Sequence, residues 1–152
     1  MTSVLFVCLG NICRSPLAEG TFAHLVETAG LQGQITYDSA GNGAWHEGDP
    51  PDPRAVRIAA KNNIDISNQK SRPMHLSDFT NFDLILCMDY DNIINVNQIC
   101  PANNTATIDL FLNHAHGTNT AVPDPYYGGS DGFERVFTQI MEANQALLEK
   151  LR

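Results

Sequence analysis

The chain has 152 residues, a net charge of −8 at pH 7 and a hydrophobic fraction of 43%. This length suits one domain with a packed core, so we expect residues 1–152 to form a single domain. The acidic charge predicts no binding to nucleic acid or to an anionic membrane, because both interactions need a basic surface. The sequence shows neither an apolar run that could span a bilayer nor a secretory signal, which favours a cytoplasmic protein.

The four cysteines are Cys8, Cys13, Cys87 and Cys100. In a chain without a secretory signal we expect reduced thiols rather than disulfides. Only the first two cysteines are close in sequence, and the five histidines show no ligand spacing beside them. We therefore expect no metal site and no cofactor.

The first half of the chain predicts strands that alternate with helices. The apolar run over residues 3–7 is typical of a strand that is buried on both faces. Ser15 and Pro16 are typical of the N-cap and the first residue of a helix, which we expect to end at Gly30. The other elements expected here are a strand over 34–39, a Gly- and Pro-rich loop over 41–53 and a helix over 53–63.

The second half continues this alternation. Its expected elements are a short helix over 76–81, a buried strand over 82–88, a helix capped by Asp89 or Asp91, a strand over 106–110, a loop over 113–129 and a final helix that begins at Ser130 or Asp131. The alternation predicts an α/β fold, a three-layer sandwich whose four-stranded parallel sheet is flanked by helices. Ligands of such folds bind beyond the carboxyl ends of the strands, so we expect the site in the loops that follow the first, second and fourth strands.

The segment that follows the first strand has the features of an anion cradle. Gly10 and Asn11 tolerate left-handed dihedral angles, so successive backbone N–H groups can point inward. The helix that follows adds the positive end of its dipole, and the guanidinium of Arg14 can bind two phosphoryl oxygens. The expected phosphate-binding residues are Leu9, Gly10, Asn11, Ile12, Cys13, Arg14 and Ser15.

Cys8 is the expected nucleophile of this cradle. A helix N-terminus and a nearby cation both favour the thiolate form of a cysteine. Ser15 either donates its hydroxyl to that thiolate or caps the helix, and the sequence leaves both roles open. It also leaves open that Cys8 only ends a buried strand, with Arg14 solvated on the helix.

Residues 7–16 (VCLGNICRSP) resemble the signature of low molecular weight protein tyrosine phosphatases. Further segments resemble the same family in the same order, namely 38–41 followed by Trp45, then 51–55, 82–89 and 124–128. The resemblance covers essentially the whole chain. It implies a sheet with strand order 2-1-3-4 and a monomeric enzyme, with a weak dimer through Tyr126 and Tyr127 as an alternative. The implied reaction is hydrolysis of phosphotyrosine in proteins, or of small aryl phosphates, through a phosphocysteine intermediate.

Asp124 is the candidate general acid. An aryl or alkyl oxygen leaves readily only when it is protonated, so a carboxylic acid is needed near the leaving group. Asp124 lies between Pro123 and Pro125, which stiffen its loop. The residues alone fit a turn aspartate equally well, and it is the resemblance that assigns Asp124 the acid role.

The resemblance also implies a substrate slot and a brace for the cradle. The expected slot residues are Trp45, His46, Tyr126 and Tyr127, whose aromatic surfaces would bury a phenyl ring. The expected brace consists of Asn11, Ser15 and Ser39. Gln69 stands where many family members have a His, and Asp52 and Asp89 match carboxylates that we interpret as structural supports.

Two alternative functions share parts of this pattern. A thioredoxin-coupled arsenate reductase of the same fold would need a relay cysteine seven positions after Cys87, where this chain has Ile94. Cys100 lies too far along the chain to fit that spacing. A noncatalytic phosphate-binding module is the second alternative, although the chain keeps both Cys8 and Asp124. The sequence does not predict the physiological substrate or a partner kinase.

Overall fold

Four parallel strands form the sheet at the centre of the molecule. The strands are β1 (Thr2–Cys8), β2 (Ile35–Gly41), β3 (Leu84–Cys87) and β4 (Thr107–Leu110), in the order β2-β1-β3-β4. The computed structural model describes residues 1–125 and 130–152, apart from the side chain of Ser130. The parallel pairing and the strand order confirm the expected sheet, although β3 is shorter than the predicted 82–88.

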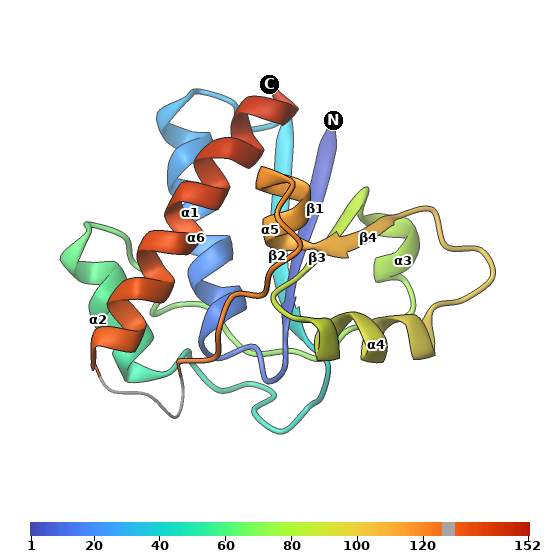
Figure 1. Ribbon diagram of the computed structural model, residues 1–152, viewed down its shortest axis with the longest axis horizontal. Helices are drawn as coiled ribbons and strands as arrows, with labels where there is room; N and C mark the ends of the chain where they lie inside the picture. Colours follow the sequence, from blue (N-terminus) through green and yellow to red (C-terminus); the bar gives the residue numbers. More distant parts are fainter. Residues whose placement is uncertain (126–129) are drawn as a thin grey trace.

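Helices cover both faces of the sheet (Figure 1). The side chains of β1 alternate between these faces and pack against the helices on each side. The helices are α1 (Arg14–Thr28), α2 (Pro53–Lys61), α3 (Asp78–Asn81), α4 (Tyr90–Ile99), α5 (Phe111–His116) and α6 (Ser130–Leu151). Val4 and Phe6 point to one face, where they pack with buried residues of α1, α2, α5 and α6. Leu5 and Val7 point to the other face, where they pack with Phe79 of α3 and with residues of α4. The three-layer sandwich is therefore confirmed.

The start of α1 differs from the prediction. The helix begins at Arg14, its N-cap is Cys13, and no side chain caps it. Ser15 lies inside the first turn, so its predicted role as N-cap is wrong, because its hydroxyl contacts Cys8 instead. The predicted end is confirmed, since Gly30 takes a left-handed conformation with φ 70° just after the last turn.

The predicted loop over 113–129 is wrong at its beginning. Residues Phe111–His116 form α5, whose Phe111, Leu112 and Ala115 are buried against the core. Gly117 ends this helix with φ 75°. A helix of six residues carries too few turns to show a clear hydrophobic period, and tertiary packing stabilises it.

The start of α4 decides between two predicted caps. Asp89 is the N-cap, and its carboxylate accepts from the N–H of Asn92, whose side chain accepts from the N–H of Asp89 in return. This reciprocal arrangement is a capping box. Asp89 therefore lies two residues after the end of β3, at the carboxyl edge of the sheet.

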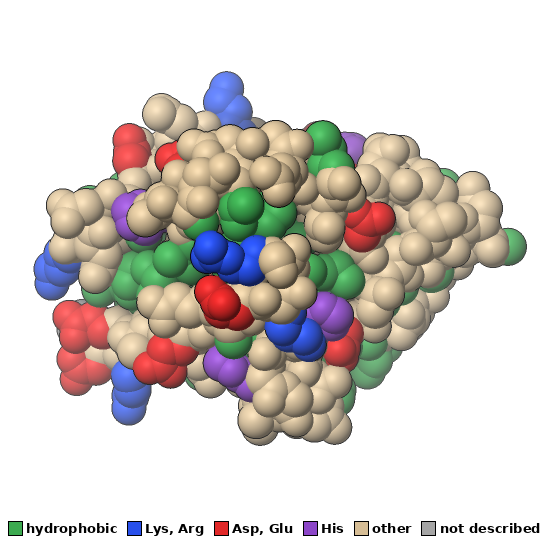
Figure 2. All heavy atoms as spheres, turned by 90° about the horizontal axis from the view of Figure 1, so that it is seen from above, with side chains coloured by type: hydrophobic (Ala, Val, Ile, Leu, Met, Phe, Trp, Pro, Cys, Tyr) green, Lys and Arg blue, Asp and Glu red, His purple; other side chains and the backbone are tan. Residues whose placement is uncertain are grey.

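Both chain ends lie at the edge of the sheet opposite the loop that follows β1 (Figure 1). On the face with the chain ends, acidic, basic and apolar side chains are interspersed (Figure 2). Within residues 1–125 and 130–152, no helix has the length and apolar character needed to cross a membrane.

Candidate active site

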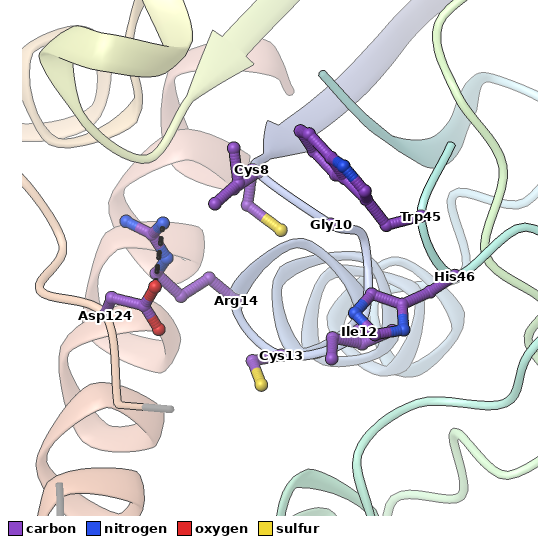
Figure 3. Close-up of a pocket in the computed structure, with 9 residues that line it drawn as sticks. Cys8, Gly10, Ile12, Cys13, Arg14, Trp45, His46 and Asp124 are labelled. Carbon is purple, nitrogen blue, oxygen red and sulfur yellow. Dashed lines mark ion pairs between the residues drawn. The ribbon is translucent and has the colours of Figure 1, made fainter. Parts of the chain in front are cut away.

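A cavity of about 210 Å³ opens at the carboxyl edge of the sheet, where β1 passes into α1 (Figure 3). Its lining residues are Cys8, Leu9, Gly10, Ile12, Cys13, Arg14, Trp45, His46 and Asp124. The cavity thus brings together the expected nucleophile, the expected acid and most of the expected phosphate-binding residues. Tyr126 and Tyr127, the other two expected slot residues, lie outside the described part of the chain.

We call residues 8–15 the cradle loop, and four of its carbonyl groups bind donors of neighbouring segments rather than facing the cavity. Backbone N–H groups of Asn42 and Gly43 donate to the carbonyls of Cys8 and Leu9 over 2.9 and 3.2 Å. The Ser71 hydroxyl and the Asp52 N–H bind the carbonyls of Gly10 and Ile12 over 2.9 and 2.8 Å.

This orientation of the carbonyls has a direct consequence for the N–H groups. The described peptide bonds are all trans, so the N–H of each peptide unit points opposite to its carbonyl. The N–H groups of Leu9, Gly10, Asn11 and Cys13 therefore face the cavity. Converging N–H groups form an anion-binding nest, which supports the interpretation of the sequence.

A left-handed residue and a close approach shape the cradle loop. Asn11 is buried and has φ 57°, a left-handed conformation that Asn adopts more readily than most residues. At Gly41, an added Cβ would lie 3.0 Å from the Leu9 carbonyl oxygen and 3.1 Å from the Gly10 carbonyl carbon. A side chain at position 41 would therefore push the cradle loop out of place.

Cys8 lies at the base of the cavity with only 3% of its surface exposed. Its Sγ atom is 3.0 Å from Ser15 Oγ, which decides the role that the sequence left open for Ser15. Asn11 Nδ2 donates to Ser15 Oγ over 2.8 Å and to Ser39 Oγ over 3.0 Å. Because Ser15 accepts from Asn11, its own O–H is available to donate to the sulfur of Cys8.

Arg14 is buried rather than solvated, with 3% of its surface exposed. Its Nη1 atom donates to Asp89 Oδ2 over 2.7 Å and to the Val122 carbonyl over 2.9 Å. Its Nη2 atom lies 3.7 Å from Asp124 Oδ2. Asp89, which we expected only as a structural support, thus pairs with Arg14, and its place directly after the predicted strand 82–88 was a usable signal for this role.

Asp124 reaches the cavity from the segment between α5 and α6. The N–H of Val122 donates to the Met88 carbonyl over 2.7 Å, so this segment is fixed to the end of β3. Asp124 then lies at the rim, with a side chain that is about one-third exposed and near the guanidinium of Arg14 (Figure 3). A carboxylate here can exchange protons with both solvent and a ligand in the cavity.

Cys13 is the second thiol of the cavity. Burial raises its pKa well above the ordinary range, and the charges of Asp52, Cys8 and Asp124 raise that pKa further. Cys13 therefore stays a neutral thiol at physiological pH. This separates its chemistry from that of the nucleophile expected at Cys8.

Trp45 and His46 line the side of the cavity away from Arg14 and Asp124 (Figure 3). The Trp45 side chain is 67% exposed, and its ring lies over Gly43, where an added Cβ would fall 2.1 Å from the ring. His46 Nδ1 lies 3.5 Å from Asp49 Oδ2, and the ring approaches Gly10. These contacts place an aromatic wall beside the cradle loop.

The brace behind the cradle loop ends on Glu19, which was not among the expected site residues. Ser39 Oγ donates to Glu19 Oε1 over 2.6 Å. Burial raises the pKa of Glu19 to about 7, the hydrogen bond from Ser39 opposes this rise, and Asp38 adds to it. Gln69 donates to the Pro16 carbonyl over 3.1 Å, and its buried Oε1 has no hydrogen-bond partner among the described residues.

Across residues 1–125 and 130–152, no group of three or more His, Cys, Asp or Glu side chains is arranged to hold a metal ion.

Comparisons with known proteins agree with this geometry. The family model described as "Low molecular weight phosphotyrosine protein phosphatase" matches residues 3–152. A low molecular weight phosphotyrosine protein phosphatase of Schizosaccharomyces pombe is 47% identical over 150 residues, with 97% of this chain and 96% of the relative covered. The corresponding human protein is 39% identical over 150 residues, with 97% of this chain and 94% of the relative covered.

Solved structures give the same result. A protein tyrosine phosphatase from Entamoeba histolytica superposes with a TM-score of 0.91 at 38% identity, covering 99% of this chain and 97% of its own. A Drosophila arginine phosphatase superposes with a TM-score of 0.90 at 32% identity, covering 99% and 97%. Since the family model and the relatives each match nearly the whole chain, the protein belongs to the low molecular weight phosphotyrosine protein phosphatase family and is a protein-tyrosine phosphatase.

Proposed function

We propose that the protein hydrolyses phosphotyrosine through a phosphocysteine intermediate formed on Cys8. The observation that carries the proposal is the position of Cys8 Sγ, 3.0 Å from Ser15 Oγ at the base of the nest of N–H groups. A hydrogen bond from Ser15 and the start of α1 both stabilise a thiolate there. The nest would hold the phosphoryl oxygens against that sulfur.

In the first step the Cys8 thiolate attacks phosphorus and the bond from phosphorus to the tyrosyl oxygen breaks. Asp124 gives its proton to the departing oxygen, so tyrosine leaves as a neutral phenol. In the second step water attacks phosphorus and gives a proton to Asp124. The phosphorus–sulfur bond then breaks, which returns Cys8 to the thiolate and releases inorganic phosphate.

Arg14 and the cradle loop would supply the electrostatic stabilisation. In the transition state negative charge spreads over the three equatorial phosphoryl oxygens. Asp89 and Val122 bind Nη1 of Arg14, which fixes the guanidinium plane beside the cavity. Preorganised donors of this kind require no rearrangement when the charge develops.

The cavity suits one aryl phosphate. Its volume of about 210 Å³ is below the roughly 300–1,000 Å³ of sites for drug-sized ligands. Trp45 and His46 would contact the phenyl ring, and the depth between rim and sulfur would favour phosphotyrosine over the shorter phosphoserine. Tyr126 and Tyr127 remain proposed slot residues.

The proposed chemistry also bears on location and assembly. Because the reaction needs Cys8 as a free thiolate, we expect the protein to work in a reducing compartment such as the cytoplasm. Activity as a monomer is part of this proposal.

The test compares the wild type with Cys8→Ser and uses Trp45, the single tryptophan of the chain, as a fluorescent probe of the cavity. We expect the wild type to release phosphate from a phosphotyrosine peptide in the presence of EDTA. Cys8→Ser should lose turnover yet still bind inorganic phosphate, and Arg14→Ala should lose both. Cys100→Ser, at the distal end of α4, is the matched control and should keep full activity.

Three outcomes would contradict the proposal. Turnover by Cys8→Ser would remove the nucleophile assignment. Loss of wild-type activity in EDTA, restored by a divalent ion, would point to metal-dependent chemistry. Hydrolysis of a phosphoarginine peptide without hydrolysis of the phosphotyrosine peptide would replace the proposed substrate.

A further inference from the structure

Glu19 is a partly buried carboxylate that the proposed reaction does not use. It lies on α1, one turn after Ser15, and its Oε1 atom accepts a hydrogen bond from Ser39 Oγ over 2.6 Å. The charged groups that act on it are Asp38 on β2 and Arg72 in the segment between α2 and α3, and Tyr37 on β2 is close enough to feel its charge. A neutral side chain at this position would avoid the cost of desolvating a carboxylate.

Hydrogen-bonded groups connect Glu19 to Cys8 without a break. Asn11 Oδ1 accepts from the Arg72 N–H over 3.0 Å, so the Nδ2 end of the amide faces Ser15 and Ser39. That amide nitrogen donates to both hydroxyl groups. Each hydroxyl is then left to donate onward. Ser39 Oγ donates to Glu19 Oε1, and Ser15 Oγ donates to Cys8 Sγ over 3.0 Å in preference to the Ala40 carbonyl, which lies 3.5 Å away.

The amide of Asn11 therefore lies between two acceptors that can both be anions. A hydrogen bond to an ionised carboxylate is roughly twice as strong as one between neutral groups. When Glu19 takes up a proton, Ser39 loses its anionic acceptor and holds Asn11 less firmly. Asn11 is also the left-handed residue of the cradle loop, so a looser amide means a looser loop.

We propose that Glu19 is a positioning residue whose ionised carboxylate, through Ser39 and Asn11, keeps Ser15 in place to donate to Cys8. The rate of the Cys8 reaction then depends on the protonation state of Glu19. This inference rests on the proposed phosphocysteine mechanism. Its readout is a change in pH dependence rather than a simple loss of activity.

The pH range of the effect follows from the environment of Glu19. Burial is the main reason that its pKa rises to about 7, and Asp38 adds to the rise while Ser39 and Arg72 oppose it. Ordinary changes of pH around neutrality would therefore change the fraction of Glu19 that is ionised. A glutamate of ordinary pKa would stay ionised throughout this range.

The first experiment measures single-turnover phosphorylation by p-nitrophenyl phosphate between pH 5.5 and 8.5. We expect Glu19→Gln to match the wild type at pH 5.5 and to be slower by about 3- to 10-fold above pH 7.5, the worth of roughly one hydrogen bond. Glu27→Gln removes the same charge from the exposed, distal part of α1 and should match the wild type at every pH.

The direction of this effect separates positioning from simple electrostatics. Removal of a negative charge near Cys8 would by itself favour the thiolate, so a purely electrostatic role predicts a faster Glu19→Gln enzyme above pH 7. Glu19→Asp keeps the charge but shortens the reach to Ser39. Positioning through the hydrogen bond predicts that Glu19→Asp is slow like Glu19→Gln, whereas a charge effect predicts wild-type behaviour.

A second measurement needs no turnover. The side-chain amide signals of Asn11 in an NMR pH titration should shift with a midpoint near 7 in the wild type and not in Glu19→Gln. Ser39→Ala, which keeps Glu19 but breaks its link to Asn11, should lose both the NMR shift and the pH-dependent part of the rate. This variant also carries the test if Glu19→Gln fails to fold.

The inference is overturned if the ratio of the wild-type to the Glu19→Gln rate stays constant across the pH range. A faster Glu19→Gln enzyme above pH 7, or Asn11 signals without a midpoint near 7, would overturn it as well. Failure of the proposed function looks different, because an inactive wild type or an active Cys8→Ser would leave the Asn11 titration intact.

Discussion

Arg14 and Asp89 form a partly buried ion pair in which Nη1 of Arg14 lies 2.7 Å from Oδ2 of Asp89. The pair joins the first turn of α1 to the residue that caps α4, two positions after the end of β3. Two elements that are far apart in the chain thus set the direction of the guanidinium before any substrate binds. The same carboxylate therefore serves the fold as a helix cap and the site as a positioning group.

We expect Asp89→Asn to lower kcat/KM for p-nitrophenyl phosphate by about 10-fold or more, since a hydrogen bond to a charged group contributes roughly 1.5–3 kcal/mol. Asn caps helices as well as Asp does, so α4 should stay intact and the melting temperature should change little. The control is Asp91→Asn, which removes an exposed carboxylate from the first turn of the same helix. Equal activity of the two variants would remove Asp89 from the site.

Asp124→Asn should slow the phosphorylation step by roughly 10²- to 10⁴-fold on phosphotyrosine, the usual contribution of general acid catalysis. The loss should be smaller on p-nitrophenyl phosphate, because p-nitrophenolate leaves without a proton far more easily than a tyrosyl oxygen. Single-turnover rates are needed, because Asp124 also assists the second step, which both substrates share. Equal losses on both substrates, with the acidic limb of the wild-type pH profile unchanged, would leave the acid unassigned.

Oxidation by peroxide should be reversible in the wild type and much less so in Cys13→Ser. The thiolate of Cys8 is oxidised to a sulfenic acid, which condenses with the Cys13 thiol to give a disulfide and water. Both cysteines line the same cavity. Recovery of activity by dithiothreitol after peroxide treatment measures the effect, with Cys100→Ser as the control. Equal recovery by Cys13→Ser would show that Cys13 does not trap the sulfenic acid.

The raised pKa of Glu19 also predicts how stability depends on pH. Its pKa rises from an ordinary value of 4.5 to about 7 in the folded protein, so the folded state binds this proton more tightly than the unfolded state. This contribution to the free energy of unfolding is complete below pH 4.5 and disappears as the pH rises through 7, a change of about 3 kcal/mol from this group.

In urea unfolding, the free energy of unfolding of the wild type should therefore be lower at pH 8 than at pH 5. This difference should be absent in Glu19→Gln. The Glu27→Gln variant should keep the wild-type difference, because the exposed Glu27 is not part of the network around Ser39. A Glu19→Gln protein with the wild-type difference between the two pH values would show that another group is responsible.

The cradle could be predicted from the sequence because its parts are contiguous. Residues 8–15 combine a buried strand, a loop with Gly10 and Asn11, and a helix start, and each of these signals is local. The parallel sheet was equally predictable, since each short apolar run is followed by a helical period. The resemblance then supplied the strand order, which the structure confirms.

The tertiary structure alone decided which side chains meet across the fold. Arg14 and Asp89 are 75 residues apart in the chain, and Ser39 and Glu19 are 20 apart. No local pattern predicts such pairs, because these two hydrogen bonds depend on the packing of α1 against β2 and on the register of β1 with β3. The same is true of Ser15, whose hydroxyl binds Cys8 rather than capping α1, and of α5, which packing stabilises. The sequence by itself determined the chemistry that residues 8–15 can perform. The packing of distant elements decided how firmly these side chains are positioned and how that positioning depends on pH.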